Sequence, residues 1–157
     1  MNTNSVLAAV WENTCGGDAV ALGCQLLGPN RKGQLHILYI IRIGRYLPVD
    51  AELADETACA EEALRAMETV AKRFKRHPNA DLVQSRSIGA AVVQEAIRRE
   101  TDTVVLATPY RERYGQFSID QEVSWVLSHA PCRVVLSRSE STSGRDGSDS
   151  HRRHPDS

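Results

Sequence analysis

The sequence predicts an α/β fold, a doubly wound sheet of five parallel strands with helices on both faces. Short continuous apolar runs such as SVLAAVW and QLHILYIIR are typical of strands buried on both faces. They alternate with longer segments in which apolar residues recur at helical spacing. The chain has 157 residues, of which 41% are hydrophobic and 25% charged, as suits one domain with a core of its own.

The first half of the chain is predicted to form two strands and two helices. Asp18 or a glycine before it can cap the first helix, and Gly28-Pro29-Asn30 ends it. The second helix follows a proline-containing connection and carries an apolar stripe that includes Leu64 and Met67. The expected strands are 5–11 and 34–42, the first helix runs to Leu27, and the second covers 51–77.

The second half continues the alternation with three strands and two helices. Polar and apolar residues alternate in 81–87, so we expect an edge strand there with one wet face. Right-handed crossovers give the strand order 3-2-1-4-5, a Rossmann-like arrangement in which the last strand is the other edge. The remaining expected elements are helices over 89–100 and 118–130 and strands over 102–108 and 132–137.

Composition limits the class of protein. Residues 1–138 are expected to form the α/β domain, and 139–157, rich in Ser, Asp and Arg, a disordered polar tail. The formal net charge of −1 does not indicate a surface for nucleic acid. The longest apolar run, LHILYII, is far shorter than the roughly 20 residues of a membrane span, and no signal peptide is recognisable. We expect a cytoplasmic protein without membrane insertion.

Motifs of enzymes and metal sites are missing from the sequence. It contains no Walker loop, no GxGxxG after the first strand, no GxSxG elbow and no CxxC pair. His129 is close to Cys132 in sequence, but a histidine at a helix end usually binds backbone carbonyls. We therefore expect no catalytic residue and no metal. Five acidic residues of the second helix are expected on a solvated face: Glu52, Asp55, Glu56, Glu61 and Glu62.

The segment 104–138 is the first place to look for a functional site. In an open α/β sheet, ligands bind where the carboxyl end of a strand meets a loop and a helix N-terminus. Arg111 and Arg113 precede the last helix, and they either form an anion clamp or pair, solvated, with nearby carboxylates. Trp11, which ends the first strand, either stacks on a ligand base or fills the crevice; a large aromatic ring usually fills space.

Three stretches carry a resemblance to a known family: LHILYII, DTVVLATPYRERYG and VSWVLSHAPCRVVL. With the order of elements, and above all the helix ending in His129-Ala130-Pro131-Cys132, they resemble the universal stress protein family over about residues 5–138. The resemblance implies a small cytoplasmic α/β protein, usually a homodimer through its last strand, that supports survival under stress. One branch of that family binds ATP or AMP, and similar domains occur attached to membrane transporters.

The nucleotide-binding branch has a signature that this chain does not keep. That branch carries Asp at the end of the first strand, where this sequence has Trp11. Its Gly-x-x-Gly, nine residues, Gly-Ser/Thr pattern falls on Ala107, Tyr110 and Asp120-Gln121. The candidate nucleotide-binding residues, all degenerate, are Trp11, Ile40, Ala107, Tyr110, Arg111, Arg113, Asp120 and Gln121.

These replacements disfavour a bound phosphate. Glycines let backbone N–H groups approach phosphate oxygens, which Tyr110 does not easily imitate. Asp120 and Glu122 in the first turn of the last helix stabilise it by about 0.3–1 kcal/mol each and repel a phosphate. Ser118 and Gln121 match a capping box that uses the same N–H donors. We therefore expect lost or weakened ATP binding and no cofactor. The alternative is an ATP or AMP sensor that uses Arg111 and Arg113.

Partner binding is the remaining functional class. The last strand, with Arg133, Val134, Val135 and Leu136, should lie at a sheet edge, and an open apolar edge promotes aggregation. Pairing with the same strand of a second copy removes this hazard and gives a homodimer; alternatively, the tail covers the edge. The sequence thus predicts a non-catalytic, dimeric stress-response or regulatory protein that binds a protein partner or a small ligand.

Overall fold

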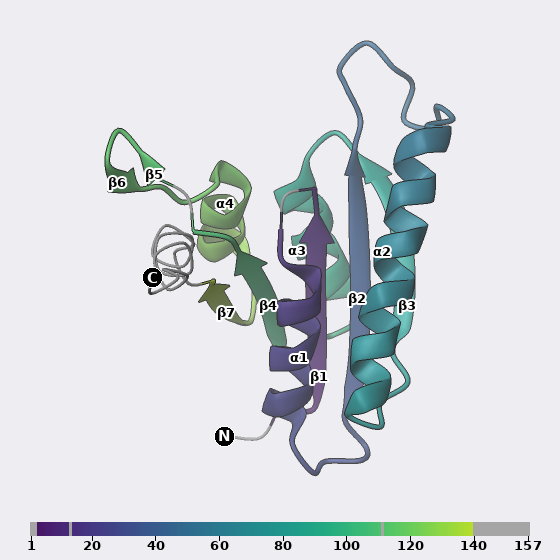
Figure 1. Cartoon of the computed structure of the whole chain (residues 1–157), viewed down its shortest axis with the longest axis vertical. Helices are drawn as coiled ribbons and strands as arrows, with labels where there is room; N and C mark the ends of the chain where they lie inside the picture. Colours follow the sequence, from purple (N-terminus) through teal and green to yellow (C-terminus); the bar gives the residue numbers. More distant parts are fainter. Residues whose placement is uncertain (1–2, 13, 111, 140–157) are drawn as a thin grey trace, which may run out of the picture.

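A five-stranded parallel sheet organises the molecule (Figure 1). The computed structural model describes residues 3–12, 14–110 and 112–139, so the expected tail beyond 139 lies outside the described residues. The helices are α1 (Gly16–Leu27), α2 (Ala54–Arg73), α3 (Ile88–Arg98) and α4 (Gln121–His129). The strands are β1 (Ser5–Trp11), β2 (Gln34–Arg42), β3 (Asn79–Ser85), β4 (Thr103–Thr108), β5 (Glu112–Arg113), β6 (Gln116–Phe117) and β7 (Arg133–Arg138).

The strand order confirms the expected topology. The sheet runs β3-β2-β1-β4-β7 with every pairing parallel, which is the order 3-2-1-4-5 of the five long strands. Trp11, the last residue of β1, is in register with Ile40 of β2. The carboxyl ends of β1 and β2 therefore lie side by side at the same end of the sheet. As expected, β3 and β7 are the outer strands.

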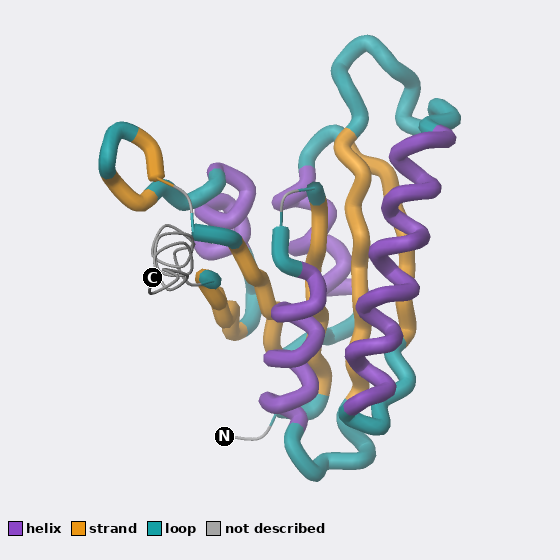
Figure 2. The backbone as a smooth tube through the Cα atoms, viewed as in Figure 1, coloured by secondary structure: helices purple, strands orange, loops and turns teal. Residues whose placement is uncertain are grey.

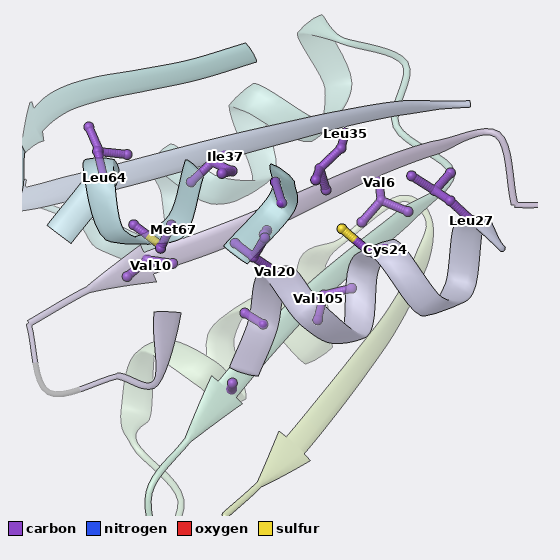
Figure 3. Close-up of a cluster of buried hydrophobic side chains, with 14 residues drawn as sticks. Val6, Val10, Val20, Cys24, Leu27, Leu35, Ile37, Leu64, Met67 and Val105 are labelled. Carbon is purple, nitrogen blue, oxygen red and sulfur yellow. The ribbon is translucent and has the colours of Figure 1, made fainter. Parts of the chain in front are cut away.

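Helices cover both faces of the sheet and divide the core in two (Figure 1). Alternate residues of β1 serve opposite faces, because successive strand side chains point in opposite directions. Val6 and Val10 pack under α1 and α2 with Met67 (Figure 3), whereas Leu7 and Trp11 belong to the cluster under α3 and α4. A strand buried on both sides needs a continuous apolar run, which explains the sequence SVLAAVW.

Helix boundaries differ from the sequence expectation. α2 begins at Ala54 and ends at Arg73, shorter than the expected 51–77. Its end is closed by Arg76 N–H donating to Ala71 O at 3.0 Å, with Lys75 at φ 59°, a position that glycine usually occupies. α1 begins at Gly16 after Cys15, so Asp18 lies in its first turn and does not cap it. Without a glycine, the end of α2 carried no local signal.

A short hairpin replaces the loop expected between β4 and α4. β5 and β6 pair antiparallel around Tyr114 and Gly115, whose φ angles of 55° and 72° are both positive. Two such residues form the tight turn that suits the twist of a hairpin. Figure 2 shows the hairpin projecting from the body of the molecule. No helix in residues 3–12, 14–110 and 112–139 is both long and apolar enough to cross a membrane.

Candidate functional site

A cleft of about 600 Å³ opens at the carboxyl ends of β1 and β2, the upper end of the sheet in Figure 1. Trp11 and Ile40, which are in register on the two strands, line it. The first turn of α2, the start of α3 and the residue before α4 complete the lining with Asp55, Ile88 and Asp120. This volume lies in the range of pockets that hold small organic ligands.

Carboxylates dominate the charge of this cleft. Its lining contains Arg42 as the one arginine or lysine among the described residues, against four acidic residues, Glu12, Asp55, Glu56 and Asp120. The negative field acts on Tyr39, whose hydroxyl pKa is raised by burial and then by the charge of Glu12. A ligand with negative charge would be repelled here.

The N-terminus of α4 is capped by Asp120. Its Oδ1 accepts a hydrogen bond from Glu122 N at 2.7 Å. α4 starts at Gln121, so Asp120 lies one residue before the helix and Ser118 lies three residues before it. The expected capping box led by Ser118 is therefore wrong. The expectation that a side chain occupies a donor at this helix end still holds for the Glu122 N–H, because Asp120 Oδ1 lies where a phosphate oxygen would have to accept.

The N-terminus of α3 is occupied by a carboxylate from another helix. Ser87 precedes α3 but makes no side-chain cap, and Glu122 of α4 accepts from Gly89 N at 2.6 Å instead. The other oxygen of Glu122 lies 3.4 Å from Arg42 Nη2. A Cβ on Gly89 would lie 2.8 Å from Trp125 Cε3, so α3 and α4 pack at a distance that requires glycine.

Comparison with known proteins rests on structure. No protein-family model matches the chain, and no curated protein is significantly similar to it in sequence. Universal stress protein UspA from Lactobacillus plantarum superposes with a TM-score of 0.68 at 18% identity, covering 88% of this chain and 99% of that one. The fold is that of the universal stress proteins.

Two further universal stress protein structures contain nucleotides. The one from Archaeoglobus fulgidus, in complex with dAMP, has a TM-score of 0.64 at 12% identity and covers 87% of this chain and 98% of that one. A universal stress protein in complex with cAMP has a TM-score of 0.60 at 15% identity, with coverage of 87% and 98%. At these identities the likeness establishes the fold.

Trp11, Ala107 and Tyr110, at positions of the nucleotide-binding signature, make contacts within this protein. Trp11 is 3% exposed and packs into the core under α3 and α4, so its ring fills space, as expected. The Ala107 carbonyl accepts from Cys15 N at 3.1 Å. Tyr110 N donates to Ser139 Oγ at 3.1 Å, and the Arg138 guanidinium lies 4.8 Å from the Tyr110 ring centre. The Tyr110 N–H is therefore not presented to a phosphate.

The structure brings together only part of the expected nucleotide site. Trp11, Ile40 and Asp120 line the cleft, whereas Ala107, Tyr110 and Gln121 are not among its described lining residues. Arg111 lies outside the described residues, and Arg113 is described only as backbone of β5.

Sequence reasoning missed several residues of the cleft. Asp55 and Glu56 are exposed, as expected, but they form part of the cleft wall, where the start of α2 faces the sheet. Arg42 could have been found, since the strand order places the end of β2 beside the end of β1.

His129 at the end of α4 behaves as expected: its Nδ1–H donates to Trp125 O at 2.9 Å.

Proposed function

We propose that this chain is a cytoplasmic, non-catalytic stress-response or regulatory protein of the universal stress protein type, in which ATP binding is lost or weakened. One observation carries the proposal. Carboxylates of the protein accept hydrogen bonds from N–H groups at the N-termini of α3 and α4, and such N–H groups are the usual donors to a phosphate. His129, which lies close to Cys132 in sequence, donates to a backbone carbonyl, which supports a non-catalytic role.

The electrostatic balance of the cleft supports the proposal. An exposed carboxylate about 5 Å from a phosphate charge opposes binding by about 0.8–3 kcal/mol, for effective dielectric constants between about 80 and 20. Glu12, Asp55, Glu56 and Asp120 outnumber Arg42, whose guanidinium already faces Glu122.

Calorimetric titration of nucleotide-stripped protein tests this proposal. ATP and AMP are added with and without magnesium, and tripolyphosphate serves as a control that carries phosphates without a nucleoside. We expect no magnesium-dependent binding of ATP beyond that of tripolyphosphate, and no binding of AMP. Micromolar binding of AMP, or of magnesium–ATP but not of tripolyphosphate, would contradict the proposal.

The second candidate is a nucleotide sensor that holds ATP or AMP with Arg111 and Arg113. The volume of the cleft and the nucleotides in similar structures favour it. If it is correct, the titration shows nucleotide binding that disappears in the double variant Arg111→Ala, Arg113→Ala. The matched control is Arg45→Ala, which removes an exposed arginine of the loop between β2 and α2.

We also propose that the protein forms a homodimer through β7. This strand is an edge of the sheet, and its residues Arg133, Val134, Val135 and Leu136 are only half-buried in one chain. A second copy would bury the apolar edge. Light scattering after gel filtration should give twice the mass of 17.3 kDa, and Val135→Lys should give a monomer. A monomeric native protein would contradict this arrangement.

A further inference from the structure

A second pocket, of about 260 Å³, lies at the amino ends of β2 and β3. It is formed between the α1–β2 connection, with Arg31 and Gly33, and the connection after α2, with Lys75, Arg76 and His77. Figure 1 shows these two connections together at the lower end of the molecule. α2, of 20 residues and therefore about 30 Å long, separates this pocket from the carboxyl-end cleft.

The charged side chains in the described lining of this pocket are all basic. Its described lining contains Arg31, Lys75, Arg76 and His77 and no acidic residue. Lys32, Lys72 and Arg73 lie beside these residues in sequence and are exposed. None of these arginines and lysines takes part in an ion pair within the described chain. A concave surface of one charge concentrates its field and attracts a ligand of opposite sign.

Arg76 is held rigidly at the centre of this charge. Its guanidinium donates to three carbonyls of the α1–β2 connection, Gly28 O at 3.0 Å, Asn30 O at 2.6 Å and Gly33 O at 3.1 Å. These carbonyls fix the guanidinium but carry no net charge to neutralise it. Since a guanidinium has five N–H donors, two have no acceptor among the described residues and can donate to a ligand.

Lys75 occupies a backbone position that disfavours it. Its φ of 59° lies in the left-handed region, at the place after a helix where glycine is the usual residue. The same geometry recurs at the end of α3, where Glu100 has φ 51° and Thr101 N donates to Ala96 O at 2.9 Å. Only Lys75 of the two lines the pocket, so the pair offers a matched comparison.

We propose that this pocket binds a small polyanion, a ligand with two or more adjacent phosphate groups. The fixed guanidinium of Arg76 receives one phosphate, and Lys75, Arg31 and His77 surround the rest. Arginine and lysine together supply directed and mobile donors for phosphate oxygens. The volume suits a diphosphate or a short polyphosphate. The proposal is independent of what the carboxyl-end cleft binds.

Calorimetric titration with pyrophosphate at low ionic strength tests the proposal, with native protein, Lys75→Gly and Glu100→Gly compared. We expect one pyrophosphate per chain, with affinity that falls as salt is added. Lys75→Gly should weaken binding about tenfold, as expected for one charge-assisted hydrogen bond. Glu100→Gly should leave the affinity within about twofold, since it makes the same backbone change away from the pocket.

Three results with pyrophosphate would overturn the proposal. They are no pyrophosphate binding to the native protein, equal affinity of the native protein and Lys75→Gly, and equal weakening by both glycine variants. A loss of folding cannot explain weaker binding, because each variant places glycine where glycine is favoured and should melt no lower than the native protein. A DNA strand of 20 nucleotides that binds more tightly, per phosphate, than pyrophosphate does would also overturn the proposal. That result would indicate a surface for nucleic acid.

Discussion

The two ends of the sheet differ in size and in the sign of their charge. The carboxyl end has the larger cleft, lined mainly by carboxylates such as Glu12 and Asp120. The amino end has the smaller pocket, lined by cations around Arg76. In open α/β proteins the carboxyl end is the usual ligand site. Here its charge and its occupied N–H groups disfavour a phosphate, so position in the fold does not by itself identify the ligand.

Helix α2 connects the two ends and carries both charges. Asp55 and Glu56 lie in its first turn, and Lys72 and Arg73 in its last. This arrangement suits the helix dipole, at about 0.3–1 kcal/mol for each charge. Helix stability therefore explains part of the segregation. It does not explain Arg31 and Arg76, which lie outside the helix and face the pocket.

Arg76→Ala should have the largest effect on stability. It removes three hydrogen bonds that join the end of α2 to the α1–β2 connection. We expect the free energy of unfolding to fall by about 2 kcal/mol. Urea denaturation monitored by circular dichroism measures the change. Arg73→Ala, an exposed residue of the same region, should change stability by less than about 0.5 kcal/mol.

If Arg76→Ala and Arg73→Ala have the same free energy of unfolding, the hydrogen bonds of Arg76 do not stabilise the connection between α1 and β2. The amino-end pocket would then lack a rigid centre, and the comparison between the two ends would lose its structural basis.

Glu122→Ala should have the next largest effect and tests the carboxyl end. It removes the acceptor of Gly89 N and the partner of Arg42. Loss of a helix cap costs about 1 kcal/mol. Glu122→Gln, which keeps an acceptor oxygen, should lose about half as much. Gln121→Ala, at an exposed neighbouring position, is the control. Unfolding curves of Glu122→Ala that match the native protein would show that its carboxylate does not hold α3.

The last prediction concerns the pH dependence of stability. His36 is 4% exposed, and burial, followed by the charge of Arg99, lowers its pKa. The positively charged groups near it are Arg98 and Arg99, and the carboxylates are Asp81 and Glu95, which oppose the shift. Arg99 Nη1 lies 2.9 Å from His36 Nδ1 and can only donate, so the neutral ring carries its proton on Nε2.

The sign of the pH effect follows from that lowered pKa. Below the ordinary histidine pKa of about 6.5, the unfolded chain binds a proton that the folded chain resists. Stability should therefore fall as pH decreases from about 6.5 to 5, by no more than about 1.4 kcal/mol per pH unit from this residue. Urea midpoints across this range should fall less in His36→Gln. His77→Gln, at an exposed histidine, is the control. Equal slopes in native protein and His36→Gln would contradict the assignment.

The sequence predicted the parts of the fold that depend on local patterns. β1 and β2 have the expected bounds, because apolar runs such as QLHILYIIR specify buried strands. The end of α2 was misplaced, because Lys75 adopts a conformation that only a glycine would have signalled. The hairpin at Tyr114 was missed because Gly115 lies among charged residues rather than between two apolar runs.

The charge of the two pockets could not be predicted from composition. The formal net charge of −1 does not indicate that acidic and basic residues are separated into two pockets, because each pocket is built from segments far apart in the sequence. Arg31 and Arg76 belong to different connections, and Glu12 and Asp120 to opposite ends of the chain. The replaced glycine positions, Ala107 and Tyr110, led to the prediction of a weak phosphate site, which stays a prediction. They did not reveal that Glu122 occupies the start of α3.

The most direct test of this account is an NMR titration of the ¹⁵N-labelled full chain with magnesium–ATP. This ligand offers a base, a sugar and three phosphates to both ends of the sheet in one sample. The account predicts shifts of the backbone amides of Lys75, Arg76 and His77, with Trp11, Glu12 and Arg42 unchanged. Saturable shifts of Trp11, Glu12 and Arg42 would place the nucleotide in the carboxyl-end cleft and contradict it.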